Sequence, residues 1–207
     1  KIALQDMISR LSDVDDMSWG RYAFSRDMLR DRVSPARRDE LIQKAMACGK
    51  EWAARMQTQL AASGPFDMAE ALGLKTEESF QSPSGGRVLF AELLPDNRIV
   101  IMRRPLDAYT EFYEKTKDAE ARRFPPPDQV RELLLAHEIF HHIEDLHRDE
   151  IFTRTETVRL WKILCFKNDS TLYAVAEIAA MSFARTLTGA PFINVRRIFE
   201  RSGIPKN

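Results

Sequence analysis

The four histidines of the chain all lie in the segment 137–147, and two of them form the motif His137-Glu138-Ile139-Phe140-His141. On a helix, His137 and His141 are one turn apart and project from the same face. Such a pair can offer two imidazole nitrogens to one zinc ion at about 2.0–2.1 Å. Glu138 lies about 100° further round the helix, beside the metal, where it can accept a proton from a zinc-bound water as general base. The motif therefore predicts a zinc-dependent hydrolase.

Apolar residues flank this motif on both sides: Leu133, Leu134, Leu135, Ala136, Ile139, Phe140 and Ile143. A helix with these neighbours is buried around the turn that faces the metal, and buried imidazoles are costly unless they find a partner. The alternative is a chance HExxH motif on a surface helix. The apolar neighbours favour the metal site.

A third ligand is needed, because a catalytic zinc usually has three protein ligands. No histidine follows His147, and His142 and His147 lie on other faces of the same helix. A carboxylate on a second helix is the better candidate. Glu177 is the one charged residue in the stretch 174–181, and a lone glutamate among apolar residues is either buried with a partner or bound to a metal. The alternative is a glutamate on an exposed turn.

The N-terminal part, residues 1–63, is predicted to be helical. Ser34-Pro35 is a typical helix start, with a hydroxyl cap followed by proline at the first helical position. An apolar stripe follows at helical spacing: Leu41, Ala45, Cys48, Trp52, Met56 and Leu60. Ser63-Gly64-Pro65 is expected to end this helix.

The middle of the chain contains a predicted β-hairpin, Val88–Leu94 and Arg98–Met102, around Pro95-Asp96-Asn97. A short helix, Asp67–Leu72, precedes it, and residues 103–124 receive no assignment. The motif helix is expected to run from about Asp128 to about His147.

Weak helical spacing follows over Thr153–Phe166. The last helix is predicted from Thr171 to about Thr188, capped by Ser170 or Asp169 and ended by Gly189 and Pro191. The expected fold class is therefore α+β, mostly helical with a small β-sheet.

Two motifs resemble those of the ImmA/IrrE family of zinc metallopeptidases, a gluzincin-like group. Leu135-Ala136-His137-Glu138-Ile139-Phe140-His141 is similar to the family's L-A-H-E-L-G-H, with Phe140 in place of the glycine. The residues that match the family's E-x-x-A-x-x-F-A-x-x-L pattern and its following proline are Glu177, Ala180, Phe183, Ala184, Leu187 and Pro191. The resemblance implies a zincin-like metallopeptidase domain with Glu177 as the third zinc ligand.

The resemblance covers roughly residues 66–191, so we divide the chain into an N-terminal helical extension, 1–63, and a metallopeptidase domain, 64–207. The interval from His141 to Glu177 is long for the family, which suggests an inserted helix over Arg154–Lys167. Family members act in the cytoplasm on regulatory proteins. The resemblance therefore implies a protein or peptide substrate such as a transcriptional repressor.

Peptide hydrolysis also needs a group that stabilises the developing oxyanion. Tyr173 and Arg185 are the candidates, and Tyr173 lies one turn before Glu177. Glu144 or Asp145 is expected to hold a ligand histidine ring. An exposed edge of the 88–102 hairpin is expected to hold an extended substrate by strand addition.

Composition limits the other function classes. The formal net charge of +0 gives no support for nucleic-acid binding, and no apolar run is long enough to cross a membrane. No apolar segment typical of a signal peptide lies in residues 1–30, and the two cysteines are far apart, as expected for a reducing cytoplasm.

Two rival hypotheses remain open. The first is a zinc-binding regulatory protein without protease activity, in which residues 1–63 bind a partner. Glu138 argues against this rival, because a structural zinc needs no base. The second rival is a helical interaction module that binds no metal.

Overall fold

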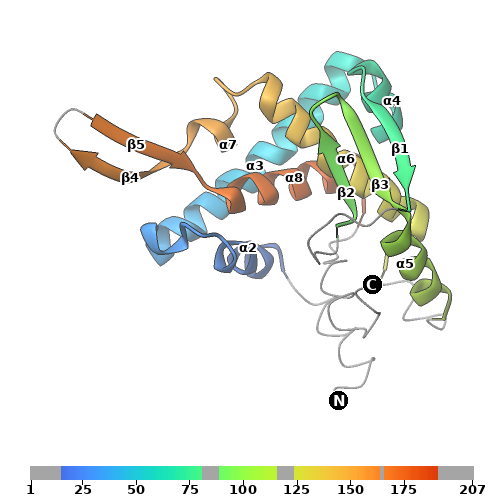
Figure 1. Ribbon diagram of the computed structural model, residues 1–207, viewed down its shortest axis with the longest axis horizontal. Helices are drawn as coiled ribbons and strands as arrows, with labels where there is room; N and C mark the ends of the chain where they lie inside the picture. The colour runs from blue at the N-terminus through green and yellow to red at the C-terminus, as the bar shows by residue number, and fades with distance from the viewer. Residues whose placement is uncertain (1–14, 81–88, 116–123, 164–165, 191–207) are drawn as a thin grey trace.

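The computed structural model describes residues 15–80, 89–115, 124–163 and 166–190, and Figure 1 shows their arrangement. Helices form the body of the molecule, and a small three-stranded sheet lies beside them. The described part of the chain is therefore α+β and mostly helical, as the sequence predicted.

The N-terminal part forms helix α2 (Asp16–Ser25), the short 3-10 helix η1 (Arg30–Arg32) and the long helix α3 (Pro35–Leu60). The predicted start of α3 is confirmed: the Ser34 side chain accepts a hydrogen bond from the Arg37 amide, and proline follows at the first helical position. The predicted apolar stripe of α3 is buried from Leu41 to Met56. Residues 1–14 lie outside the described part of the chain.

Helix α3 packs along helix α8 (Tyr173–Thr188), and the two cross the centre of Figure 1 side by side. Their contact is close at Gly49, where a Cβ atom would lie 2.2 Å from the Ala179 carbonyl oxygen. The Ser182 hydroxyl also donates a hydrogen bond to the Met46 carbonyl at 2.8 Å. One hydrophobic cluster contains buried residues of α3, α8 and the motif helix α6 (Pro127–Leu146). Residues on both sides of the predicted boundary between 63 and 64 therefore share one hydrophobic core.

The sheet has the strand order β1-β3-β2, with β1 (Lys75–Ser79), β2 (Ala91–Leu94) and β3 (Arg98–Met102). Strands β2 and β3 form the predicted antiparallel hairpin, and Asn97 takes the left-handed conformation in its turn. The short helix α4 (Pro65–Ala71) precedes β1. Strand β1 was not predicted, because its sequence Lys-Thr-Glu-Glu-Ser is polar throughout, and it pairs in parallel with β3. This order leaves β2 at an edge of the sheet.

Helix α5 (Arg103–Lys115) occupies part of the segment without an assignment. Its Tyr109 is fully buried, and the Tyr109 hydroxyl donates a hydrogen bond to the Pro125 carbonyl at 2.7 Å. Tyr109, Phe90, Phe124 and Val130 form a second, smaller cluster, which joins α5 to the start of α6.

The prediction of an inserted helix over Arg154–Lys167 is wrong. A single turn, α7 (Phe152–Thr155), is followed by the antiparallel hairpin of β4 (Thr157–Ile163) and β5 (Phe166–Thr171), which projects from the helical body in Figure 1. Residues such as Thr157, Val158 and Trp161 favour a strand, and Arg159 pairs across the hairpin with Asp169 at 2.9 Å. Cross-strand pairing therefore overrides the weak helical spacing.

The predicted cap of the last helix is also wrong. Helix α8 begins at Tyr173, and Leu172 at its N-cap position supplies no side-chain hydrogen bond. Ser170 and Asp169 are both part of β5 instead. The predicted end is confirmed at Gly189, which takes the left-handed conformation, whereas Pro191 lies outside the described residues.

Candidate metal centre

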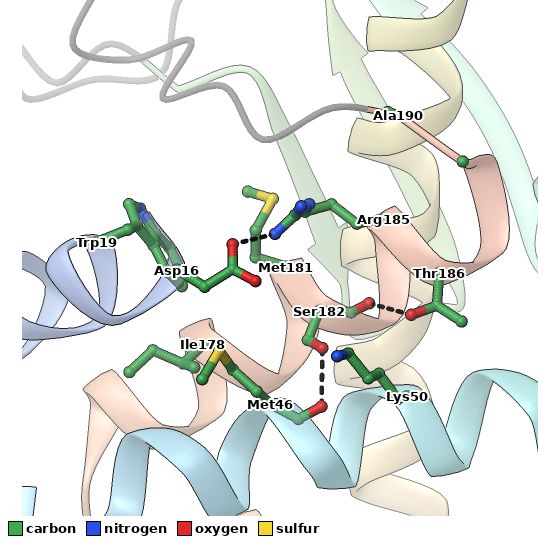
Figure 2. A pocket seen from close by; sticks show the side chains of 11 residues that line it. Asp16, Trp19, Met46, Lys50, Ile178, Met181, Ser182, Arg185, Thr186 and Ala190 are labelled. Carbon is green, nitrogen blue, oxygen red and sulfur yellow. Dashed lines mark hydrogen bonds and ion pairs between the residues drawn. The ribbon is translucent and has the colours of Figure 1, made fainter. Parts of the chain in front are cut away.

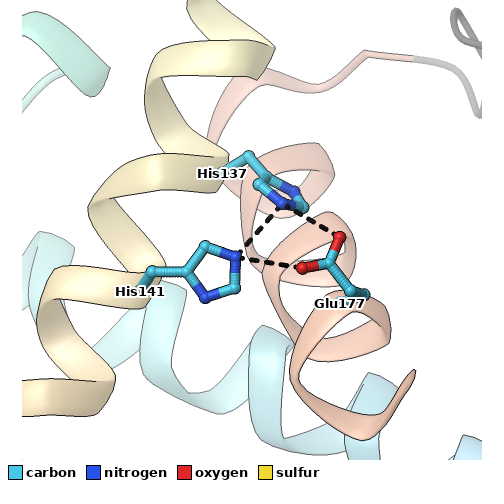
Figure 3. A group of neighbouring side chains, drawn as sticks. All are labelled: His137, His141 and Glu177. Carbon is cyan, nitrogen blue, oxygen red and sulfur yellow. Dashed lines mark hydrogen bonds and ion pairs between the residues drawn. The ribbon is translucent and has the colours of Figure 1, made fainter. Parts of the chain in front are cut away.

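The histidine motif lies in the middle of helix α6. The helix begins at Pro127 and carries buried apolar residues on both sides of the motif: Val130, Leu133, Leu135, Ala136, Ile139, Phe140 and Ile143. Helix α6 contacts α8 and the strands β2 and β3. His137 and His141 therefore project from a fixed helix toward α8, as Figure 3 shows.

Glu177 of α8 faces the two histidines across this helix pair (Figure 3). The Nε2 atoms of His137 and His141 are 3.2 Å apart. The Glu177 carboxylate oxygens lie 3.5 Å from His137 Nε2 and 3.4 Å from His141 Nε2. Neighbouring ligand atoms of a tetrahedral site with bonds of 2.0–2.1 Å are about 3.3 Å apart. The three side chains are thus close enough to hold one metal ion.

Charge pairing dominates the electrostatics of this group. Burial alone would lower the pKa of His141, but Glu144 and Glu177 outweigh burial and raise the pKa to about 10. Burial alone would raise the pKa of Glu177, whereas the two imidazoles lower it well below its usual range. The cluster therefore favours a cation beside Glu177, and a bound metal ion would supply one in place of the proton.

Glu144 binds the His141 ring at the nitrogen that faces away from Glu177. It is fully buried, and its Oε2 accepts a hydrogen bond from His141 Nδ1 at 2.8 Å. This bond leaves His141 Nε2 to face Glu177. Arg154 of α7 lies 3.7 Å from the same Glu144 oxygen. Of the two predicted ring partners, Glu144 makes this contact, whereas Asp145 is exposed and pairs with Arg154 at 3.1 Å.

The Glu138 side chain extends from α6 to the edge strand β2 of the sheet. Its Oε2 accepts a hydrogen bond from the Leu93 amide of β2 at 3.1 Å. Glu138 lines a cleft of about 600 Å³ together with His137, His141 and Glu177. The predicted base and the predicted ligands therefore share one accessible site.

The cleft has β2 along one wall and α2 along another, where Trp19, Tyr22 and Arg26 line it. Tyr173, the predicted oxyanion donor, also lines the cleft at the start of α8, with 68% of its surface exposed. The α2 residues were missed in the sequence, because they lie far from the motif and form no motif of their own.

Arg185, the other predicted oxyanion donor, lies elsewhere. It forms an ion pair with Asp16 in a separate pocket of about 200 Å³, which Lys50 and Trp19 also line (Figure 2). The two remaining histidines are also outside the metal group. Burial lowers the pKa of His142, and His147 pairs with Glu150 at 2.6 Å.

In comparisons with known proteins, no family model, curated protein or solved structure matches the chain. Among the described helices, none combines the length and apolar character that a membrane span requires. What the structure establishes is a His137, His141 and Glu177 group that can hold a metal ion, set in a cleft beside Glu138.

Proposed function

We propose that this chain is a zinc-dependent metallopeptidase with a zincin-like core. The observation that carries the proposal is the set of Nε2 and carboxylate distances of 3.2–3.5 Å among His137, His141 and Glu177. Two imidazoles and one carboxylate are the ligand set of several zinc peptidases. The presence of Glu138 in the same cleft favours a catalytic site over a structural one.

Zinc in this site would polarise the peptide carbonyl and lower the pKa of a bound water toward about 7. Glu138 accepts the proton of the attacking water and returns it to the leaving amine. The Leu93 amide orients the Glu138 carboxylate through its hydrogen bond of 3.1 Å. The Tyr173 hydroxyl is our candidate donor to the oxyanion.

The edge strand β2 supplies a surface for an extended peptide. The Phe90 carbonyl accepts a hydrogen bond from the Met102 amide of β3, whereas the Leu93 amide points away from β3 to Glu138. Because backbone groups alternate along a strand, those of Ala91 point away from β3 as well. A substrate strand can therefore pair with β2 beside the metal ligands.

The natural substrate class is proposed from the sequence resemblance alone. On that ground we propose a regulatory protein such as a transcriptional repressor, cleaved in the cytoplasm. The mostly apolar lining of the cleft suits a peptide with a large apolar side chain near the scissile bond.

A peptide library with detection by mass spectrometry tests the activity without a known substrate. The zinc-loaded chain should cleave a subset of peptides, and a chelator should abolish this cleavage. The Glu138→Gln variant, loaded with zinc in the same way, is the background control.

The outcomes separate the hypotheses. If the zinc-loaded chain cleaves no peptide and no candidate repressor, the peptidase proposal is wrong and the zinc-binding regulator takes its place. If the chain binds no zinc at all, both are wrong.

A further inference from the structure

Asp27 is a buried carboxyl group at the end of helix α2, with 2% of its surface exposed. A buried carboxyl group is costly unless its oxygens accept hydrogen bonds. Both oxygens of Asp27 do: Oδ1 accepts from the Leu29 amide at 2.7 Å, and Oδ2 accepts from the Ala174 amide at 2.8 Å. The second bond joins α2 to helix α8, 147 residues later in the chain.

This second bond caps helix α8. The first amides of any α-helix lack a carbonyl partner within the helix, and a side chain just before the helix usually serves them. Leu172 cannot do so, because its side chain has no acceptor. Asp27 therefore takes the place of a local N-cap residue.

The capped turn directly precedes the candidate third ligand in helix α8. Ala174 and Glu177 are one helical turn apart, and Ala174, Tyr173 and Glu177 all line the cleft. Tyr22 and Arg26, which precede Asp27 in the chain, line the same cleft. The Asp27 carboxyl group thus ties the α2 side of the cleft to the first turn of α8, one turn before Glu177.

We propose that Asp27 is a positioning residue for the metal centre. It holds the first turn of α8 where the Glu177 carboxylate faces both imidazoles, and it fixes the α2 wall to that turn. This inference rests on the proposed function, because it requires that His137, His141 and Glu177 bind a metal. It also gives the N-terminal segment a direct part in the geometry of the site.

Cobalt(II) is the probe for this inference, because its visible absorption reports the geometry of its ligands. The full chain is titrated with cobalt against a competing chelator, well below its melting temperature. Asp27→Ala should lower the cobalt affinity by about 10–100-fold, as expected for a group that orients a ligand, and should change the absorption spectrum. Asp27→Asn keeps the shape and one acceptor oxygen, so it should restore part of the affinity.

The matched control is Ser34→Ala, which removes a helix cap from α3. It should lower the melting temperature but keep the cobalt affinity and spectrum of the parent. A merely structural role for Asp27 would give the same pattern in Asp27→Ala.

Each outcome decides between two claims. If the parent binds cobalt and Asp27→Ala keeps its affinity and spectrum, the positioning role is wrong and the proposed function stands. If the parent binds no cobalt, the proposed function itself is wrong. If Asp27→Ala does not fold, Asp27→Asn decides, and a parent-like affinity and spectrum in that variant overturn the inference.

Discussion

Glu138 and Glu177 lie in the same cleft but have different proposed roles, base and ligand. Glu138→Gln keeps the size of the side chain and removes the proton acceptor, so we expect it to keep zinc and lose activity by about 10²-fold or more. Glu177→Ala removes one of three ligands and leaves a hole between two packed helices. It should lose zinc and melt at a lower temperature, because metal binding and folding are linked.

Zinc content and melting temperature, each with and without chelator, measure both variants. If Glu177→Ala binds zinc as tightly as the parent, the third ligand lies elsewhere. If Glu138→Gln is the variant that loses zinc, the two roles are reversed.

Glu144 is the residue that we expect to tune the affinity of the metal site. Glu144→Gln weakens the hydrogen bond to His141 Nδ1, which is 2.8 Å long in the parent, and so makes the ring a poorer ligand. We expect zinc affinity to fall by about tenfold, measured by competition with a chromophoric chelator. Glu150→Gln is the matched control, because Glu150 pairs with His147 at the same sequence spacing, outside the metal group. Equal effects of the two changes would contradict a specific role for Glu144.

The sequence predicted which three side chains come together. Helical spacing alone places His137 and His141 on one face, and the apolar neighbours of Glu177 marked it as buried or bound. The choice of Glu144 over Asp145 could not be predicted, because it depends on how α6 is rotated against α3 and α7. The contacts of Asp27 with α8 could not be predicted either, since no local pattern links residues so far apart.

Helices α3 and α8 approach each other closely at Gly49, where there is no room for a side chain. Gly49→Ala would place a Cβ atom 2.2 Å from the Ala179 carbonyl oxygen and 2.8 Å from the Phe183 amide nitrogen. Alanine favours a helix over glycine by about 1 kcal/mol, but a backbone clash must push the helices apart. Because the clash is with backbone atoms, we expect a cost near the upper end of the overpacking range and a net loss of about 1–2 kcal/mol in the free energy of unfolding, measured by denaturant titration.

Gly64→Ala is the control, because nothing lies within 4 Å of the added atom. It should cost about 0.5 kcal/mol or less, as for the loss of a glycine cap. A Gly49→Ala variant as stable as this control would mean that the two helices are not in close contact.

Elements with strong local signals were predicted, and elements that depend on strand pairing without such a signal were not. The Ser34-Pro35 start and the hairpin turn at Asn97 follow from local chemistry. Strand β1 is polar and exists through pairing with β3, and the β4–β5 hairpin is stabilised by contacts between its own strands. The spacing of apolar residues within a segment therefore predicts neither element.

At the scale of the whole molecule, the sequence suggested that residues 64–207 would fold without residues 1–63. The packing leads us to expect the opposite, because α3 and α8 share one hydrophobic core. A chain that begins at Gly64 would expose the face of α8 that covers α3. We expect it to show no cooperative thermal transition by circular dichroism and to bind no zinc. A cooperative transition with bound zinc would instead confirm the boundary at residue 63.

We propose above that His137, His141 and Glu177 together bind one zinc ion beside Glu138. The most direct test is anomalous X-ray diffraction at the zinc absorption edge from crystals of the zinc-loaded chain. We expect one strong peak at about 2.0–2.2 Å from His137 Nε2, His141 Nε2 and a Glu177 carboxylate oxygen. A peak at other residues, or no peak in crystals grown with excess zinc, would contradict it.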